Sequence, residues 1–304
     1  MRILIIRPAA LGDTLMLAPA LSNSREWGDV IVAGRRLGID FLRPLISQCL
    51  DFEGPGWHAL FMDVPDPGVG LPVKEADKII AFLNDPERVV KKNLERCFPG
   101  AVVAVLPGYP REDEPVHVAL YLARAMESSG LPVDAEKVMT EAVKGLLLLS
   151  GHRPRLRIVF HPGSGGAQKN HPPEFWLDLL KAFRKKIPAI EEPPVVLLGP
   201  AEEKLVPLFS GERDVEILLS PDRDRLLLLL QQTLLYVGHD SGITHLAAML
   251  GAPTIALFRH SSVAQWSPLG PRVKVIQAST SGPELVEESL KAADGFLNQN
   301  ARLW

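Results

Sequence analysis

LYVGHDSGITHLAAMLGAPTIALF spans residues 235–258 and sets the expected fold. It predicts a buried strand over Leu235–Val237, a polar turn, a helix that begins near Ile243, and a second strand over Thr254–Phe258. In an open parallel sheet, such a turn lies outside the carboxyl ends of the strands, where ligands bind. Because free N–H groups at a helix start attract anions, the segment predicts a phosphate or nucleotide site.

The same alternation of strand and helix runs through the rest of the chain. In the first half we expect strands at 3–6, 30–33, 57–63 and 102–106, and helices at 36–48, 74–98 and 116–129. In the second half we expect strands at 157–161, 195–198, 215–219 and 273–276, and helices at 173–186, 224–232 and 283–303. Strands that alternate with helices predict the α/β class, with parallel sheets covered on both faces.

The chain length predicts two domains. Its 304 residues suit two domains of about 150 residues each. A basic, turn-rich segment at Gly151–Arg155 is a plausible linker, so we expect domains at 1–150 and 151–304.

Composition and charge argue against several classes of protein. A net charge of −3 gives no basic face for nucleic acid, so we expect no nucleic-acid partner. Apolar runs such as Leu226–Leu230 fall far short of the roughly 20 residues of a membrane span. The apolar run near the N-terminus is too short for a signal peptide, which predicts a cytoplasmic protein. Cys49 and Cys97 lack metal-ligand spacing and read as small core residues.

Asp13 is the candidate functional residue in the first half of the chain. It follows the first expected strand and Gly12, and it stands just before a helix expected from Thr14. Asp is among the favoured N-cap residues, so a capping role competes with a chemical one.

A glycine-rich turn, Gly163-Ser164-Gly165-Gly166, follows the first strand of the second half. Glycine lets backbone N–H groups approach a phosphate, but the turn lacks both the dinucleotide fingerprint and the P-loop pattern, so a plain loop remains possible. Lys169 supplies a mobile charge suited to a pyrophosphate, or is an ordinary surface lysine. Asp222 and Asp224 could bind a metal, but they directly precede an apolar helix, so we interpret them as caps and expect no metal.

Asp240, Ser241 and His245 bring together a carboxylate, a hydroxyl and an imidazole at the corner described first. The competing interpretation is that the histidine caps or packs rather than binds.

Four segments together resemble glycosyltransferase family nine, whose best-known members are the lipopolysaccharide heptosyltransferases. They are ILIIRPAALGDTLMLAPAL (3–21), HPGSGGAQK (161–169), LLGPAEE (197–203) and GHDSGITHLAAMLGAPTIALF (238–258). The similarity extends from residue 2 to about residue 270. Each motif is loose, but all four stand in the family's order and position.

The resemblance implies a GT-B fold: two Rossmann-like domains that face a central cleft, with the C-terminal helix crossing back to the first. It implies inverting sugar transfer without metal or other cofactor. The donor would be a nucleotide-sugar, ADP-heptose in the known members, and the acceptor a glycan or glycolipid of the lipopolysaccharide core. A lipid-linked acceptor would bring peripheral contact with the inner membrane, at its cytoplasmic face.

The resemblance also assigns roles to residues. Asp13 matches the general base, and Lys169 matches a lysine that contacts the donor phosphates. Either Glu202 or Glu203 matches a glutamate that contacts the nucleotide. The donor-binding signature covers Asp240, Ser241, Gly242, Thr244 and His245, and the glycine-rich turn adds Ser164 and Gly165.

Two departures stand out. The family usually has Lys-x-Trp-Pro where this chain has Lys169-Asn170-His171-Pro172, and Phe-Gly-x-Thr where it has Phe258-Arg259-His260-Ser261. Two other functions stay open: a nucleotide-sugar epimerase, and a catalytically degenerate protein that only binds a nucleotide-sugar. A dehydrogenase fits least, because the dinucleotide fingerprint is missing.

Overall fold

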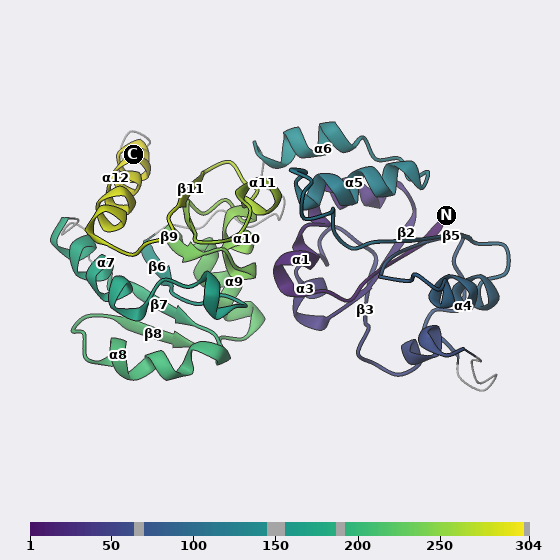
Figure 1. The fold of residues 1–304 in the computed structure, drawn as a ribbon, viewed down its shortest axis with the longest axis horizontal. Coiled ribbons are helices and arrows are strands. Elements are labelled where there is room, and N and C mark those ends of the chain that lie inside the picture. Colours follow the sequence, from purple (N-terminus) through teal and green to yellow (C-terminus); the bar gives the residue numbers. More distant parts are fainter. Residues whose placement is uncertain (64–69, 145–155, 187–191, 301–304) are drawn as a thin grey trace. The chain divides into compact units, whose positions relative to one another are not determined.

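The computed structural model describes residues 1–63, 70–144, 156–186 and 192–300 (Figure 1). The chain divides into two compact units, Met1–Val143 and Lys144–Trp304. The expected boundary at residue 150 and the expected linker at 151–155 lie outside the described residues.

The first unit is a five-stranded parallel sheet with helices. In chain order its elements are β1 (Arg2–Arg7), α1 (Leu11–Leu15), α2 (Ala18–Leu21), the 3-10 helix Ser24–Glu26, β2 (Asp29–Gly34), α3 (Arg36–Asp40), β3 (Gln48–Asp51), the 3-10 helix Trp57–Phe61, β4 (Lys78–Phe82), α4 (Val89–Cys97), β5 (Val102–Leu106), α5 (Val118–Ser128) and α6 (Ala135–Ala142).

The strand order is β3-β2-β1-β4-β5, with β1 at the centre. Ile3–Ile6 is fully buried, as a central parallel strand covered on both faces requires, and Ile5 pairs with Val32 on one side and Ile80 on the other. The order reverses between β1 and β4, so the carboxyl end of β1 is where a crevice for ligands is expected.

Three predictions in the first unit were wrong. Trp57–Phe61 forms a 3-10 helix rather than a strand, with the Trp57 indole buried and donating to the Asp51 carbonyl at 2.9 Å. The helix predicted over 74–98 contains β4, because a short apolar run such as KIIAF fits a buried strand as well as a helix. The helix predicted from Arg36 ends at Asp40, before Pro44, and β3 begins at Gln48.

The second unit is a six-stranded parallel sheet with helices. In chain order its elements are β6 (Arg157–His161), the 3-10 helix η3 (Ala167–Lys169), α7 (Pro173–Lys186), β7 (Val195–Leu198), the 3-10 helix η4 (Pro200–Leu205), α8 (Val206–Ser210), β8 (Glu216–Leu219), α9 (Arg223–Gln231), β9 (Thr233–His239), α10 (Gly242–Met249), β10 (Thr254–Phe258), α11 (Val263–Trp266), β11 (Val273–Gln277) and α12 (Pro283–Asn300).

Its strand order is β11-β10-β9-β6-β7-β8, which is doubly wound and reverses between β6 and β9. The predicted α/β class is thus confirmed in both units. β6, β7, β10 and α7 have the predicted bounds. α12 packs against α7 and strands β9–β11 of its own unit (Figure 1); its predicted return to the first domain stays a prediction. Within the described ranges, no helix has the length and apolarity needed to cross a membrane.

Candidate active site

The corner between β9 and α10 is built from buried hydroxyl groups. Ser241 is the N-cap of α10, and its Oγ accepts from the Thr244 N–H at 3.3 Å. Thr244 is fully buried; its Oγ1 donates to the His239 carbonyl and lies 3.0 Å from Ser241 Oγ and 3.2 Å from Tyr236 Oη. Thr244, predicted as a donor-binding residue, therefore uses its side chain to shape the corner, and Gly242 opens the helix beside it.

Asp240 and Lys169 form an ion pair at this corner. Lys169 Nζ donates to Asp240 Oδ2 at 2.7 Å, with the aspartate side chain 4% exposed and the lysine side chain 43% exposed. His245 Nε2 lies 3.6 Å from Asp240 Oδ1. Burial opposes ionisation of Asp240, but the interactions of this carboxyl with His245, Lys169 and Ser261 outweigh burial and hold its pKa well below its usual range.

The ion pair leaves Lys169 able to bind an anion. An ammonium has three N–H donors, one of which is used on Asp240, and the side chain reaches solvent. His245 is buried, and its Nδ1 has no hydrogen-bond partner among the described residues. Together with the N–H groups at the start of α10, these side chains place hydrogen-bond donors of a kind suited to an anion at the reversal between β6 and β9. We call this set (Lys169, Asp240, Ser241, Gly242 and His245) the anion corner.

The glycine-rich turn after β6 is organised by Ser164 and Glu202. Ser164 Oγ donates to Asn170 Oδ1 at 2.5 Å and accepts from the Gly166 N–H at 3.3 Å. Glu202 accepts from the Gly199 N–H at 3.0 Å and fills the space where Gly163 lacks a side chain, since a Cβ there would lie 2.4 Å from Glu202 Cδ. A Cβ on Gly165 would meet open space, so only Gly163 is required by packing.

A cavity of about 330 Å³ opens on this turn, within the second unit. Ser164, Gly165 and Glu202 line it, together with Trp176, Lys204 and Leu205 from α7 and η4. Glu202 is buried whereas Glu203 is exposed and does not line the cavity. The predicted donor residues thus fall into two groups, one around the cavity and one at the anion corner.

Both departures from the family pattern contact residues that stand next to the anion corner in the chain, His239 and Asn170. The His171 ring lies 5.1 Å from the Phe175 ring and 5.4 Å from the His239 ring, so an imidazole takes a place in an aromatic cluster. Arg259 Nη1 donates to the Asn170 carbonyl at 2.8 Å, beside Lys169. Ser261 keeps a hydroxyl where the family usually has threonine, and it helps to lower the pKa of Asp240.

Three buried histidines support the corner, and sequence reasoning gave them no such role. His239 Nε2 accepts from the His171 N–H at 2.8 Å, so the proton of the neutral ring is on Nδ1, which donates to the Pro162 carbonyl at 3.0 Å. Burial lowers the pKa of His239 to about 3, and those of His161 and His171 to about 4. These rings are neutral at physiological pH. His239 joins the end of β9 to Pro162 after β6 and to His171 near Lys169, whereas His161 bonds the Leu197 carbonyl of β7.

Asp13 lies at the carboxyl end of β1, in the first unit. The capping interpretation was wrong, because Ala10 is the N-cap of α1 and Asp13 stands in its first turn. Its carbonyl accepts from Arg7 Nε at 2.9 Å, and Arg7 Nη1 donates to the Gly108 carbonyl at 2.8 Å. Arg7 was not predicted as a site residue. The sequence feature that could have identified it is its position as a charged residue at the end of the buried strand β1.

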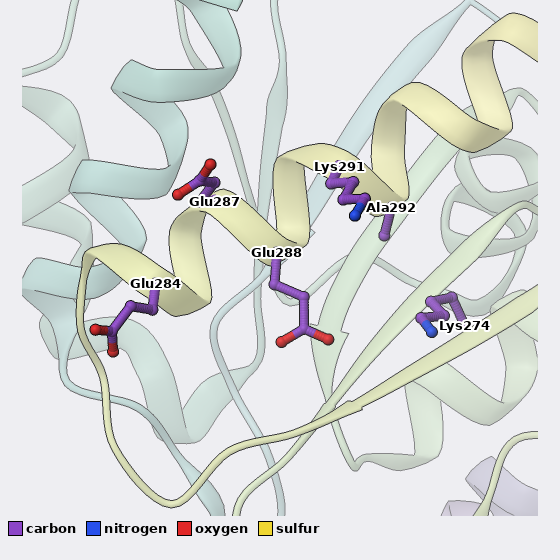
Figure 2. Close-up of a pocket in the computed structure, with 6 residues that line it drawn as sticks. All are labelled: Lys274, Glu284, Glu287, Glu288, Lys291 and Ala292. Atoms are coloured by element: carbon purple, nitrogen blue, oxygen red, sulfur yellow. The ribbon is translucent and has the colours of Figure 1, made fainter.

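Two other groups of described acidic side chains lie apart from the predicted site residues. Asp222 caps α9 by accepting from the Arg225 N–H at 2.8 Å, as interpreted from the sequence. A hollow of about 510 Å³ lies along α12 and β11; Figure 2 shows its glutamates on the helix and Lys274 on the strand. None of the predicted site residues lines it. In the part of the chain that the structure describes, no three His, Cys, Asp or Glu side chains gather as metal ligands would.

The fold matches that of several solved structures. A glycosyltransferase family 9 protein from Veillonella parvula aligns over 98% of this chain and 97% of its own, with TM-score 0.70 and 17% identity. The E. coli heptosyltransferase WaaC with ADP aligns over 99% and 100%, with TM-score 0.68 and 17% identity. The E. coli ADP-heptose lipopolysaccharide heptosyltransferase II aligns over 99% and 100%, with TM-score 0.66 and 19% identity. The architecture is therefore the GT-B type.

The family model for glycosyltransferase family 9 (heptosyltransferase) matches residues 109–293, more than half of the chain. The chain belongs to this family and is a glycosyltransferase. A search of curated proteins gives no match.

Proposed function

We propose that the enzyme transfers heptose from ADP-heptose to a sugar of a lipopolysaccharide core or a related glycan, with inversion and without a metal ion. The ion pair of Lys169 and Asp240 at the start of α10 is the observation that carries the proposal. A buried carboxylate fixes a lysine whose remaining N–H donors can bind the diphosphate and offset its growing charge.

In this proposal the Asp13 carboxylate accepts the proton of the acceptor hydroxyl. The hydroxyl oxygen forms a bond to the anomeric carbon on the face opposite the diphosphate. The bond from that carbon to the diphosphate breaks, and its electron pair leaves with the nucleoside diphosphate. The configuration is inverted because the attack occurs in line.

The cavity at the glycine-rich turn is proposed to hold the nucleoside. Glu202 lines the cavity and Glu203 does not, so Glu202 is proposed as the glutamate that contacts the nucleotide. Ser164 and Gly165 border the cavity, while Lys169, Ser241, Gly242 and His245 would surround the phosphates.

Thermal unfolding in the presence of ADP-, GDP-, UDP- and CDP-sugars tests the donor. A ligand at 100 times its dissociation constant stabilises the folded state by about 2.7 kcal/mol. We expect ADP-heptose to raise the Tm of the wild type and of Glu203→Gln, and to have a smaller effect on Glu202→Gln. Preference for another nucleotide would contradict the donor assignment, and no response to any donor would contradict the nucleotide-sugar site.

Product analysis separates the possible functions. With ADP-heptose and a heptose-deficient lipopolysaccharide core, transfer should give ADP and a lengthened core, and excess EDTA should leave the rate unchanged. Conversion of the sugar in place, without acceptor, would instead identify an epimerase. Donor binding without either reaction would identify a degenerate binding protein.

The proposed acceptor is a glycolipid, so we also propose that the enzyme works in the cytoplasm, at the cytoplasmic face of the inner membrane. Co-sedimentation with vesicles that contain the heptose-deficient lipopolysaccharide should exceed co-sedimentation with plain phospholipid vesicles. Equal recovery with both would contradict contact through the acceptor.

A further inference from the structure

Arg259 stands at the carboxyl end of β10, in one of the two departures from the family pattern, and sequence reasoning assigned it no role. β10 pairs in parallel with β9, so Arg259 leaves its strand close to the point where Asp240 leaves β9. The Asp240 N–H donates to the Leu257 carbonyl at 3.1 Å, which fixes the two strand ends against each other. The backbone of Arg259 thus lies at the edge of the anion corner.

Two hydrogen bonds hold the Arg259 guanidinium across the end of the second sheet. Its Nη1 donates to the Asn170 carbonyl at 2.8 Å, and its Nε donates to the Ser279 carbonyl at 3.2 Å. Asn170 is the residue after Lys169, in the segment that follows β6, whereas Ser279 follows β11. Because the strand order is β11-β10-β9-β6, the end of β9, where Asp240 lies, falls between these two anchors.

Most N–H groups of this guanidinium stay available. A guanidinium has five N–H donors, and the two main-chain carbonyls accept from one each, which leaves three. The Arg259 side chain is half-buried, so part of it reaches solvent. Among the described residues, no carboxylate lies within salt-bridge distance of Arg259. The side chain is therefore a fixed cation whose charge no described acidic group neutralises.

The ion pair of the anion corner does not supply such a charge. Lys169 Nζ and Asp240 Oδ2 lie 2.7 Å apart, and their formal charges cancel. A diphosphate is a multiply charged anion, so it is held more strongly where the site carries net positive charge. Arg259 adds that charge next to Lys169, since its guanidinium contacts the carbonyl of the following residue.

We propose that Arg259 is a second diphosphate-binding residue: its free N–H groups bind phosphate oxygens of the nucleotide-sugar beside Lys169. The inference rests on the proposed nucleotide-sugar donor. The planar fork of a guanidinium fits two phosphate oxygens at once, whereas the Lys169 ammonium acts as a point charge. The family usually has glycine at this position, which has no side chain, so the contact distinguishes this chain from the family pattern.

Arg259→Gln tests the inference, because glutamine keeps a polar side chain with N–H donors and loses the charge. Calorimetry with ADP and with inorganic pyrophosphate should give affinities about 10–100-fold below those of the wild type, the range for hydrogen bonds to a charged group. Adenosine, which has no phosphate, should bind the variant and the wild type equally in an NMR titration. Arg259→Lys keeps the charge and should recover part of the loss. Arg213→Gln is the matched control, since it removes the same charge from an exposed position before β8, at the opposite end of the sheet.

Two results would overturn the inference. The first is wild-type affinity for pyrophosphate in Arg259→Gln. The second is an equal loss of affinity for ADP and adenosine that Arg259→Lys does not recover, because the side chain would then act only by holding the loops after β6 and β11.

Pyrophosphate also separates this inference from the proposed function. If pyrophosphate binding depends on Arg259 but the wild type does not bind ADP-heptose, the donor assignment fails and the diphosphate contact stands. If Arg259→Gln binds pyrophosphate and ADP-heptose as the wild type does, the proposed function stands and the inference falls. A wild type that binds neither pyrophosphate nor ADP would overturn both.

Discussion

The two units use the same strand-to-helix corner in opposite electrostatic ways. In the second unit the buried charge is the Asp240 carboxylate, which is paired with Lys169 and His245. In the first unit the buried charge is the Arg7 guanidinium, which is held by two main-chain carbonyls and two aromatic rings. Both corners follow a central strand at the point where the strand order reverses.

This difference fits the two tasks proposed for the corners. A buried carboxylate that fixes a lysine presents positive charge to a diphosphate without leaving that charge unpaired before the donor binds. A buried guanidinium below Asp13 leaves the carboxylate itself free to accept a proton. The corner proposed to bind the donor is thus built around a fixed anion, and the corner proposed to react is built around a fixed cation.

Low pH should give the largest difference in stability between the two units. His161, His171 and His239 have lowered pKa values in the folded second unit, so between about pH 6.5 and pH 4 the unfolded chain binds more protons than the folded one. Their contribution is complete above pH 6.5 and is lost as pH falls. Each histidine changes the free energy of unfolding by about 1.4 kcal/mol per pH unit in that window, so the three together change it by about 4 kcal/mol per pH unit.

Hydrogen exchange measured at pH 7 and pH 5 checks this prediction. Protection of β6 and β9 should fall at the lower pH, while β1 and β4 in the first unit serve as the internal control. Equal loss of protection in both sheets would mean that the buried histidines do not set the acid response.

Asp13→Asn should have the next largest effect. Turnover of ADP-heptose with the core acceptor should fall by about 10²–10⁴-fold, because the proton of the acceptor hydroxyl loses its base. The rise in Tm that the donor causes should remain, since the anion corner is unchanged. A variant that loses donor binding together with turnover would contradict the division of tasks between the corners.

The sequence predicts the helices and strands that local signals mark, and it fails where contacts between residues distant in the sequence decide the structure. α7 and β10 were predicted with their observed bounds because Pro173 and the apolar run Thr254–Phe258 mark them locally. β4 was missed because KIIAF is short enough for either structure, and pairing with β1 and β5 decides it.

The candidate site shows the same limit. Asp13, Lys169 and Asp240 were identifiable because motif spacing places them at strand ends. Their partners were not: the pairing of Lys169 with Asp240 spans 71 positions, and the bond from Arg7 to Gly108 spans 101. Contacts between residues so far apart in the sequence depend on the order of strands in the sheet, and local sequence patterns do not specify that order.

Lys169→Met tests the ion pair through stability. The variant leaves the buried Asp240 carboxylate without its cation, and we expect a loss of about 1–3 kcal/mol in the free energy of unfolding at pH 7. Lys185→Met, at an exposed position on α7, is the matched control and should stay within about 0.5 kcal/mol of the wild type. Equal values for the two variants, from urea unfolding, would show that Asp240 does not depend on Lys169.

Gly163→Ala should give the smallest effect, and it tests the wall of the proposed nucleoside cavity. The added Cβ displaces Glu202, which loses its bond to the Gly199 N–H, so we expect a loss of about 1 kcal/mol. Donor affinity should fall as well, because Glu202 moves within the cavity. Gly165→Ala is the matched control, since its Cβ enters open space and leaves Glu202 in place. If calorimetry with ADP-heptose gave both variants the same affinity, Glu202 would have no part in donor binding, and the anion corner would carry recognition alone.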